Sequence, residues 1–278
     1  MRIIVCVKQV PDIAEINQME TDPKTGTIIR EGLPAILNPF DEYALEEAIV
    51  WKEKYGAEVI AISMGPPQTE DALIKCLSMG ADRAILLSDR NFAGSDTIAT
   101  TYTLAHAIRQ IGDFDLVFCG QRAIDGDTAQ VGPMLAENLH IPQITYVNRV
   151  DMAGKKVVAR RELEDRYEIV RCSVPVLLTV VKGINIPRVP SYSSLSEAME
   201  MEIPIWTAED MKLEKHRIGL PGSPTAVTRI WPPAPRPGGQ VLTGEPSELA
   251  GRLAELLLNT LGTQISNHRH SRGLEEDP

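Results

Sequence analysis

The sequence has few cysteines, and none of them are paired. Cys6, Cys76, Cys119 and Cys172 are far apart and form no CxxC motif. That spacing gives no support to a structural zinc site or an iron–sulfur cluster, so we predict no metal site. Cys6 and Cys119 each end an apolar run, which predicts small buried hydrophobic residues.

Long apolar runs and an excess of positive charge are also absent. No run approaches the roughly 20 apolar residues of a membrane span, and the start M-R-I-I-V-C-V-K-Q shows no signal-peptide pattern. With 28 basic and 38 acidic residues the net charge is −10, which disfavours binding to nucleic acid or to an anionic membrane. We therefore expect a cytoplasmic, reduced protein without membrane insertion.

The pattern of a catalytic nucleophile is missing as well. The sequence has no GxSxG motif, and its histidines are scattered over helical, loop and tail segments. We therefore predict no catalytic residue in this chain. A nucleotide could still bind locally through backbone dipoles.

What the sequence does have is an alternation of strands and amphipathic helices. Five continuously apolar, β-branched runs are typical of parallel strands covered on both faces. The runs are Ile3–Val7, Glu58–Ile62, Ala84–Leu87, Asp115–Cys119 and Gln143–Val147. Helical patterns lie between and after them at about 39–54, 69–80, 96–111 and 128–139. The sequence thus predicts an α/β fold with a doubly wound, mostly parallel sheet.

The pattern changes after residue 150. Runs at 156–161, 167–171 and 175–181 predict an antiparallel hairpin addition at the sheet edge, and beyond Val181 no packed-domain pattern returns. Residues 219–244 hold six prolines and five glycines, typical of an extended linker, and Ser247–Leu261 forms an apolar helical stripe. We expect a nucleotide-binding domain with its hairpin at 1–185, a partner-docking loop and helix segment at 186–218, and a C-terminal arm with an apolar helix and a disordered tail at 219–278.

The most informative stretch follows the fourth predicted strand and enters the fourth helix. Residues 120–133 read G-Q-R-A-I-D-G-D-T-A-Q-V-G-P. A loop that opens a helix at the carboxyl end of a parallel strand offers free N–H groups to a phosphate, and Thr128, Gln130 and Arg122 could add contacts. A tight turn capped by Asp127 or Thr128 explains the same spacing, since the loop is neither a Walker loop nor GxGxxG.

Three further segments end predicted strands or begin the next helices. Gly94–Thr100 starts a helix, for which a plain N-cap at Ser95 or Asp96 is the alternative interpretation. Asn38–Asp41 starts the first helix with an N-cap residue type, a proline and an acid. Ile62–Pro67 ends the second strand. Because these strand ends share one edge, the four segments together predict a nucleotide crevice, without specifying a reaction.

With these residues in view, the sequence closely resembles the β subunit of the electron transfer flavoproteins from residue 1 to about 200. The shared motifs are V-C-V-K-Q-V-P-D (5–12), N-P-F-D (38–41), a G-P pair (65–66), M-G-A-D-R-A (79–84) and G-Q-R-A-I-D-G-D-T-A-Q (120–130). The family signature around the hairpin is also present, although Arg166 stands where the family usually has glycine or an acid.

The resemblance implies a heterodimer with an α subunit and an adenine nucleotide held in this chain. Ordinary members hold AMP there as a structural ligand while the α subunit carries the redox FAD. Members that bifurcate electrons from NADH hold a second FAD in the β subunit. Carried over by position, the cofactor-binding residues are Cys6, Asn38, Pro39, Phe40, Asp41, Met64, Gly120, Gln121, Arg122, Ala123, Asp125, Gly126, Asp127, Thr128, Ala129, Gln130 and Val131.

Residues 92–102 (F-A-G-S-D-T-I-A-T-T-Y) resemble the bifurcating subset. By that resemblance the helix start would receive the second phosphate and the ribityl portion of FAD, through Ser95, Asp96, Thr97 and Thr100. Asp96 is assigned to capping or to a ribityl hydroxyl, because an acid does not suit a phosphate. The implied function is electron transfer between NADH or a dehydrogenase and an acceptor; the alternative is a non-redox, AMP-binding structural subunit.

The segment after Pro187-Arg188-Val189-Pro190 resembles the loop with which this family docks dehydrogenases. Many members continue it with lysines, whereas this sequence has Glu197, Glu200 and Glu202. A loop of opposite charge is expected to prefer a different partner surface. Which partner this loop binds is therefore open, and the resemblance implies an acyl-CoA dehydrogenase or another dehydrogenase.

Overall fold

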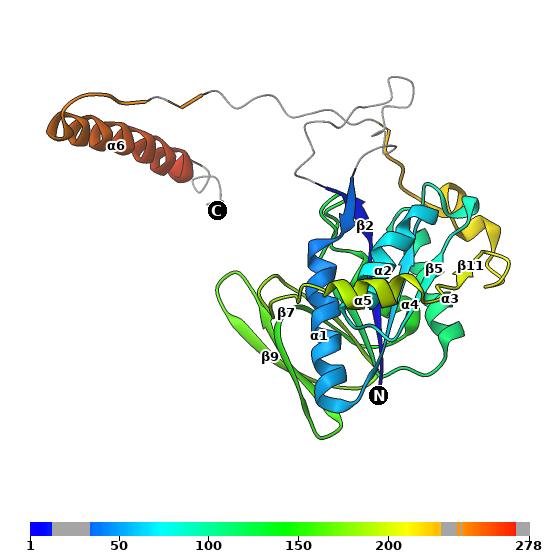
Figure 1. The fold of residues 1–278 in the computed structure, drawn as a ribbon. Coiled ribbons are helices and arrows are strands. Elements are labelled where there is room, and N and C mark those ends of the chain that lie inside the picture. Colours follow the sequence, from blue (N-terminus) through cyan, green and yellow to red (C-terminus); the bar gives the residue numbers. More distant parts are fainter. Residues whose placement is uncertain (13–33, 229–237, 240, 271–278) are drawn as a thin grey trace, which may run out of the picture. The chain divides into compact units, whose positions relative to one another are not determined.

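The computed structural model describes residues 1–12, 34–228, 238–239 and 241–270. The chain divides into two compact units, Met1–Ile230 and Trp231–Pro278. Figure 1 shows the ribbon of the chain.

The first unit is built on one nine-stranded sheet, in the order β11-β5-β4-β1-β6-β10-β7-β8-β9. Neighbouring strands are parallel from β11 to β7, and β7, β8 and β9 pair antiparallel. The bounds are β1 (Arg2–Cys6), β4 (Glu58–Met64), β5 (Arg83–Leu87), β6 (Leu116–Gly120), β7 (Gln143–Ala153), β8 (Lys156–Glu162), β9 (Tyr167–Ser173), β10 (Val176–Val180) and β11 (Ile205–Trp206). A separate antiparallel pair joins β2 (Gln9–Pro11) to β3 (Ala35–Leu37). The predicted α/β class and mostly parallel sheet are confirmed.

One strand of the predicted edge addition, β10, lies in the interior of the sheet instead of at its edge. β8 and β9 form the antiparallel edge, but β10 runs parallel between β6 and β7, in the interior of the sheet. All five residues of β10 are buried, as expected for a strand covered on both faces. The antiparallel hairpin is therefore confirmed, whereas the run at 175–181 belongs to the parallel core.

Helices cover both faces of the sheet. Side chains of α1 (Pro39–Tyr55) and α2 (Glu70–Met79) pack with Ile3 and Val5 of β1. Those of α3 (Thr97–Ile111) and α4 (Val131–Leu139) pack with Ile4 and Cys6 on the other face. This alternation along β1 is the two-residue period of a strand. α5 (Tyr192–Met199) lies alongside α2 and contacts it (Figure 1).

The chain after Val181 is packed, contrary to the sequence-based expectation. Asn185 donates to the carbonyl of Tyr43, and the Arg188 guanidinium pairs with Glu46 at 2.9 Å, both on α1. Further on, β11 pairs with β5, and a set of apolar side chains is buried against the α3 face: Ala208, Met211, Leu213 and Ile218. The short 3-10 helices of the unit are η2 (Pro67–Thr69), η3 (Arg90–Phe92), η4 (Lys215–Arg217) and η5 (Leu220–Gly222).

The second unit contains the predicted apolar helix. α6 spans Pro246–His270, longer than the predicted 247–261. Leu253, Leu256 and Leu257 on it are exposed. A disordered tail was predicted at 267–278, but α6 continues to His270, and residues 271–278 lie outside the described part of the chain. Within the described part of the chain, every helix is too short or too polar to cross a membrane.

Candidate nucleotide-binding site

The candidate site lies where two neighbouring strands separate. The chain goes from β1 to β4 and β5 on one side, then crosses over to β6 on the other side of β1. Beyond its end, β1 continues toward β4, since Val7 donates to the carbonyl of Ile62 at 2.9 Å. β6 continues toward β10, since Gln121 donates to the carbonyl of Val180 at 2.9 Å. Such a switch point leaves a crevice at the carboxyl ends of the strands, where open α/β sheets bind ligands.

The start of α1 spans this crevice. The buried carboxylate of Asp41 accepts the N–H of Lys8 at 2.8 Å and the N–H of Gly120 at 3.1 Å. One oxygen thus holds the chain just after β1 and the other holds the end of β6. Burial raises the pKa of Asp41 to about 7, against the opposing effect of the hydrogen bonds it accepts.

Asn38 holds the loop that follows β6. Asn38 was predicted as an N-cap of α1, but its side chain makes no capping hydrogen bond. Instead its amide donates to the carbonyl of Arg122 at 2.9 Å and accepts from the N–H of Ile124 at 3.2 Å. Pro39 begins the helix as expected. Asn38 and Asp41 therefore contact the protein backbone and shape the crevice.

The 120–131 loop combines ion pairs with unpaired backbone donors. Lys8 pairs with Asp125 at 2.7 Å, and Arg122 pairs with Asp127 at 2.8 Å while its guanidinium lies 5.2 Å from the ring centre of Phe40. These cations offset the two carboxylates that would otherwise repel an anion. Lys8 was missed by sequence reasoning, although it stands two residues after the end of the first strand.

Positive φ angles at Asp127 and Ala129 (51° and 53°) turn the chain before α4. For this reason α4 begins at Val131 instead of the predicted residue 128. The N–H groups of Thr128, Ala129 and Val131 have no hydrogen-bond partner among the described residues. A Cβ at Gly126 would meet no atom within 4 Å. Unpaired N–H groups at a helix start beside open space suit a phosphate.

The start of α3 adjoins this loop. The Thr97 hydroxyl donates to the Gln130 side chain at 3.0 Å. Asp96 caps α3 by accepting the N–H groups of Ile98 and Ala99 at 2.9 and 3.1 Å, in agreement with one of its two expected roles. The Ser95 hydroxyl donates to the carbonyl of Phe92 at 2.7 Å, so its proton is used within the chain. Thr100 donates its N–H to the carbonyl of Asp96 at 3.0 Å, as part of the helix.

A segment from the end of the first unit covers the α3 start. Residues 219–225 bond to 93–96: Ser223 accepts the N–H of Asp96 at 2.8 Å, and Thr225 donates its hydroxyl to the second oxygen of Asp96 at 2.8 Å. Gly219 donates to the Ser95 hydroxyl at 3.1 Å. No local pattern in the sequence indicates these contacts, because the residues are separated by more than 120 positions.

Two of the expected site residues, Cys6 and Met64, make no hydrogen bond to the loop among the described residues; they pack in the same apolar cluster as Val131. Cys6 is buried opposite Cys119 in the β1–β6 register, and a hydrogen bond with Cys6, then burial, raises the pKa of the Cys119 thiol. Cys6 and Cys119 are thus both buried, as their positions at the ends of apolar runs predicted. Met64 is half-buried at the end of β4 and packs with the α3 face of the core. No group of three or more His, Cys, Asp or Glu side chains in the described residues could hold a metal ion.

Comparison with known proteins agrees with this geometry. Residues 25–211 match the electron transfer flavoprotein domain. The chain is 48% identical over 257 residues to the electron transfer flavoprotein subunit beta of Clostridium acetobutylicum, covering 92% of this chain and 98% of that one. The chain belongs to the electron transfer flavoprotein β-subunit family.

Other relatives carry different names. The chain is 49% identical over 259 residues to the caffeyl-CoA reductase-Etf complex subunit CarD of Acetobacterium woodii, covering 92% of this chain and 98% of CarD. Protein FixA of Azorhizobium caulinodans is 46% identical over 244 residues, covering 85% of this chain and 86% of FixA. Electron transfer is the role that the family assigns to this β subunit.

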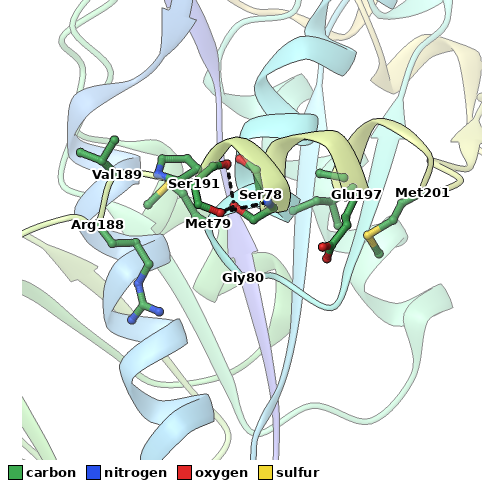
Figure 2. A pocket seen from close by; sticks show the side chains of 12 residues that line it. Ser78, Met79, Gly80, Arg188, Val189, Ser191, Glu197 and Met201 are labelled. Atoms are coloured by element: carbon green, nitrogen blue, oxygen red, sulfur yellow. Dashed lines mark hydrogen bonds between the residues drawn. The ribbon is translucent and has the colours of Figure 1, made fainter.

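Within the segment 186–218, which the sequence predicts as a partner-docking segment, α5 lies against α2. A groove of about 380 Å³ lies between the end of α2 and α5, with Arg188 and Met201 at its two ends (Figure 2). Two apolar side chains of the segment are exposed to solvent, Val189 at 91%, which lines the groove, and Tyr192 at 88%, which does not. Glu197 lies in α5, and Glu200 and Glu202 follow its end. The segment thus presents apolar side chains within an acidic surrounding.

Proposed function

We propose that this chain is the β subunit of a heterodimeric flavoprotein that carries electrons between NADH or a dehydrogenase and an acceptor, with a bifurcating FAD in the crevice. The observation that carries the proposal is the pair of helix starts, α4 and α3, joined by the hydrogen bond between Thr97 and Gln130. A diphosphate needs donors at two places, and two neighbouring helix starts offer them. The likeness of residues 92–102 to the bifurcating subset supports the same assignment.

In this proposal the chain binds and orients the cofactor. The N–H groups of Thr128, Ala129 and Val131 take one phosphate, and Thr97 with the α3 start takes the second. FAD, when bound, supplies hydride and one-electron chemistry, which belongs to the cofactor itself. The pairing of Asp125 and Asp127 with Lys8 and Arg122 keeps these carboxylates from repelling the phosphates.

A second candidate is the structural AMP-binding subunit. The observation that favours it is the closed start of α3, where Ser95 and both oxygens of Asp96 are engaged within the chain. Denaturing the purified heterodimer and measuring its nucleotides separates the two: two FAD per heterodimer supports the bifurcating proposal. One FAD with one AMP supports the structural subunit.

Three variants test the site itself. Gly126→Val places a side chain where an added Cβ meets no atom within 4 Å, so it is expected to obstruct a bound ligand, and Thr128→Ala removes a donor. Both are expected to release nucleotide with an unchanged circular dichroism spectrum. Replacing Ser95 and Thr97 together by alanine is expected to remove the β-subunit flavin and NADH oxidation while the α-subunit flavin stays. Nucleotide retained at wild-type stoichiometry in all of them would contradict the site.

For the partner, we propose a dehydrogenase or reductase of CoA thioesters that docks on residues 186–201. CarD is named as a subunit of a caffeyl-CoA reductase complex, and the exposed apolar side chains at Val189 and Tyr192 suit a protein contact. The acidic residues around them favour a basic partner surface. Tyr192→Ala is therefore expected to weaken co-purification with such an enzyme, with the nucleotide content unchanged.

A further inference from the structure

The hydrogen bonds of Asp41 connect two strand ends that diverge beyond the β1–β6 register. The β1–β6 register ends with the pair Cys6 and Cys119, and beyond it the chains continue to β4 and β10 respectively. The carboxylate stands across this fork, bonded to Lys8 on one side and Gly120 on the other. Gly120 is the first residue of the 120–131 loop. Asp41 therefore helps to set the position of the loop relative to β1, together with Asn38 and the Lys8–Asp125 ion pair.

A carboxylate suits the position because both of its oxygens accept hydrogen bonds. Each of them faces a backbone N–H, which can only donate. Protonation turns one oxygen into a hydroxyl donor that faces another donor. An amide in place of the carboxylate has the same mismatch, since its NH₂ group only donates. The ionised form is therefore the one in which both oxygens accept a backbone N–H without a competing donor.

We propose that the ionised carboxylate of Asp41 is the positioning group of the crevice, and that its protonation loosens the 120–131 loop and weakens nucleotide binding. This inference rests on the proposed nucleotide site. Asn38, one turn earlier, strengthens the same arrangement by holding Arg122 and Ile124 of the loop. The start of α1 would then act on the ligand through the loop.

The surroundings of Asp41 make this titration observable near neutral pH. Burial raises its pKa to about 7, and the Lys8 charge acts in the opposite direction. The other titratable groups that face it are thiols: burial raises the pKa of Cys76 on α2, and Cys119 on β6 is raised by Cys6 and by burial. The neighbouring Glu42 is paired with Lys75 of α2. Asp41 is thus the group among them expected to change charge near neutrality.

The test is the pH dependence of AMP and FAD binding by the full chain, purified with its α subunit and stripped of nucleotide. Calorimetric titration between about pH 5.5 and about pH 8.5 should show wild-type affinity falling at least about fivefold as pH decreases through 7. Asp41→Asn should bind at least about fivefold more weakly than the wild type at high pH, with a flat pH profile. Glu42→Gln, a matched change at the neighbouring acid that pairs with Lys75, should keep the wild-type affinity and slope.

Hydrogen exchange gives a second readout that needs no variant. The Lys8 and Gly120 amides should lose protection in wild-type protein as pH falls through 7, after correction for intrinsic exchange rates. A flat wild-type binding profile, the wild-type slope retained in Asp41→Asn, or amide protection independent of pH would each overturn the inference. A wild-type protein that binds neither AMP nor FAD at any pH would instead remove the proposed site, and the inference with it.

Discussion

At the end of β6, the Cα of Gly120 lies close to the start of α1. A Cβ there would stand 2.4 Å from Oδ1 of Asp41 and 2.7 Å from the carbonyl carbon of Phe40. Since the helix backbone cannot move away freely, we expect Gly120→Ala to lower the free energy of unfolding by about 1–3 kcal/mol. Urea denaturation measures this. Gly126→Ala is the control, because its Cβ meets nothing within 4 Å. Equal stability of the two variants would contradict the close approach.

The raised pKa of Asp41 also affects stability. The folded chain keeps this proton up to about pH 7, whereas the unfolded chain releases it near the ordinary value of 3.8. Between these values the folded state holds one more proton, so the contribution of Asp41 to the free energy of unfolding falls as pH rises. The slope is at most about 1.4 kcal/mol per pH unit.

Urea denaturation at a series of pH values, on wild type and Asp41→Asn, isolates this effect. Between about pH 4 and about pH 7, the unfolding free energy of the wild type should fall relative to that of Asp41→Asn. Above about pH 7 the difference between them should stay constant. Parallel pH profiles would show that Asp41 does not titrate there. The expected shift, together with pH-dependent nucleotide binding, would mean that the ionised form of Asp41 shapes the site at the expense of stability.

At the scale of elements, residues 219–225 are held at the start of α3 by side-chain hydrogen bonds. The double variant Ser223→Ala with Thr225→Val removes the hydroxyl contacts with Asp96 and Gly94. We expect faster amide exchange at residues 219–225 and 93–96, because local opening then costs less. The sheet amides should be unchanged. Val227→Ala, at an exposed side chain, is the control and should leave both segments protected.

The elements themselves were largely predictable because their apolar patterns are local. The five strands at Ile3–Val7 and beyond, and the first three helices, follow from runs and periods of a few residues. The start of α4 was predicted three residues early, because no local pattern in the sequence indicates the positive φ angles at Asp127 and Ala129. The packing of residues 182–225 could not be predicted either. Its buried residues, such as Ala198 and Ile218, are isolated and follow no period.

The candidate site was predictable in its place but not in its contacts. Parallel strands put their carboxyl ends at one edge, so the segments at Asn38 and Gly120 had to come near each other. Which atoms meet depends on tertiary geometry. Asn38 holds the loop instead of capping its helix, Asp41 joins two strand ends, and Ser95 uses its proton within the chain. Such distant pairings leave no local pattern in a single sequence.

At the scale of the whole molecule, the boundary of the arm follows from the packing of its first residues. Ile218 is buried in the core, and residues 219–225 are bonded to 93–96, so both belong to the first unit. A chain that ends after Arg217 would lose this packing as well as the arm. A chain that ends after Val227 would lose only the linker and the second unit, which includes α6.

We therefore expect the chain 1–227 to keep the unfolding free energy of its first unit and its hydrogen-exchange pattern at 219–225. Its affinity for the α subunit should fall by several kcal/mol, since Leu253, Leu256 and Leu257 form an exposed apolar stripe worth about 25 cal/mol per Å² when buried on a partner. Calorimetric titration of the α subunit with the full and shortened chains measures the loss. Replacing the three leucines by alanine in the full chain should reproduce most of it. Unchanged affinity in both would mean that α6 does not contact the α subunit.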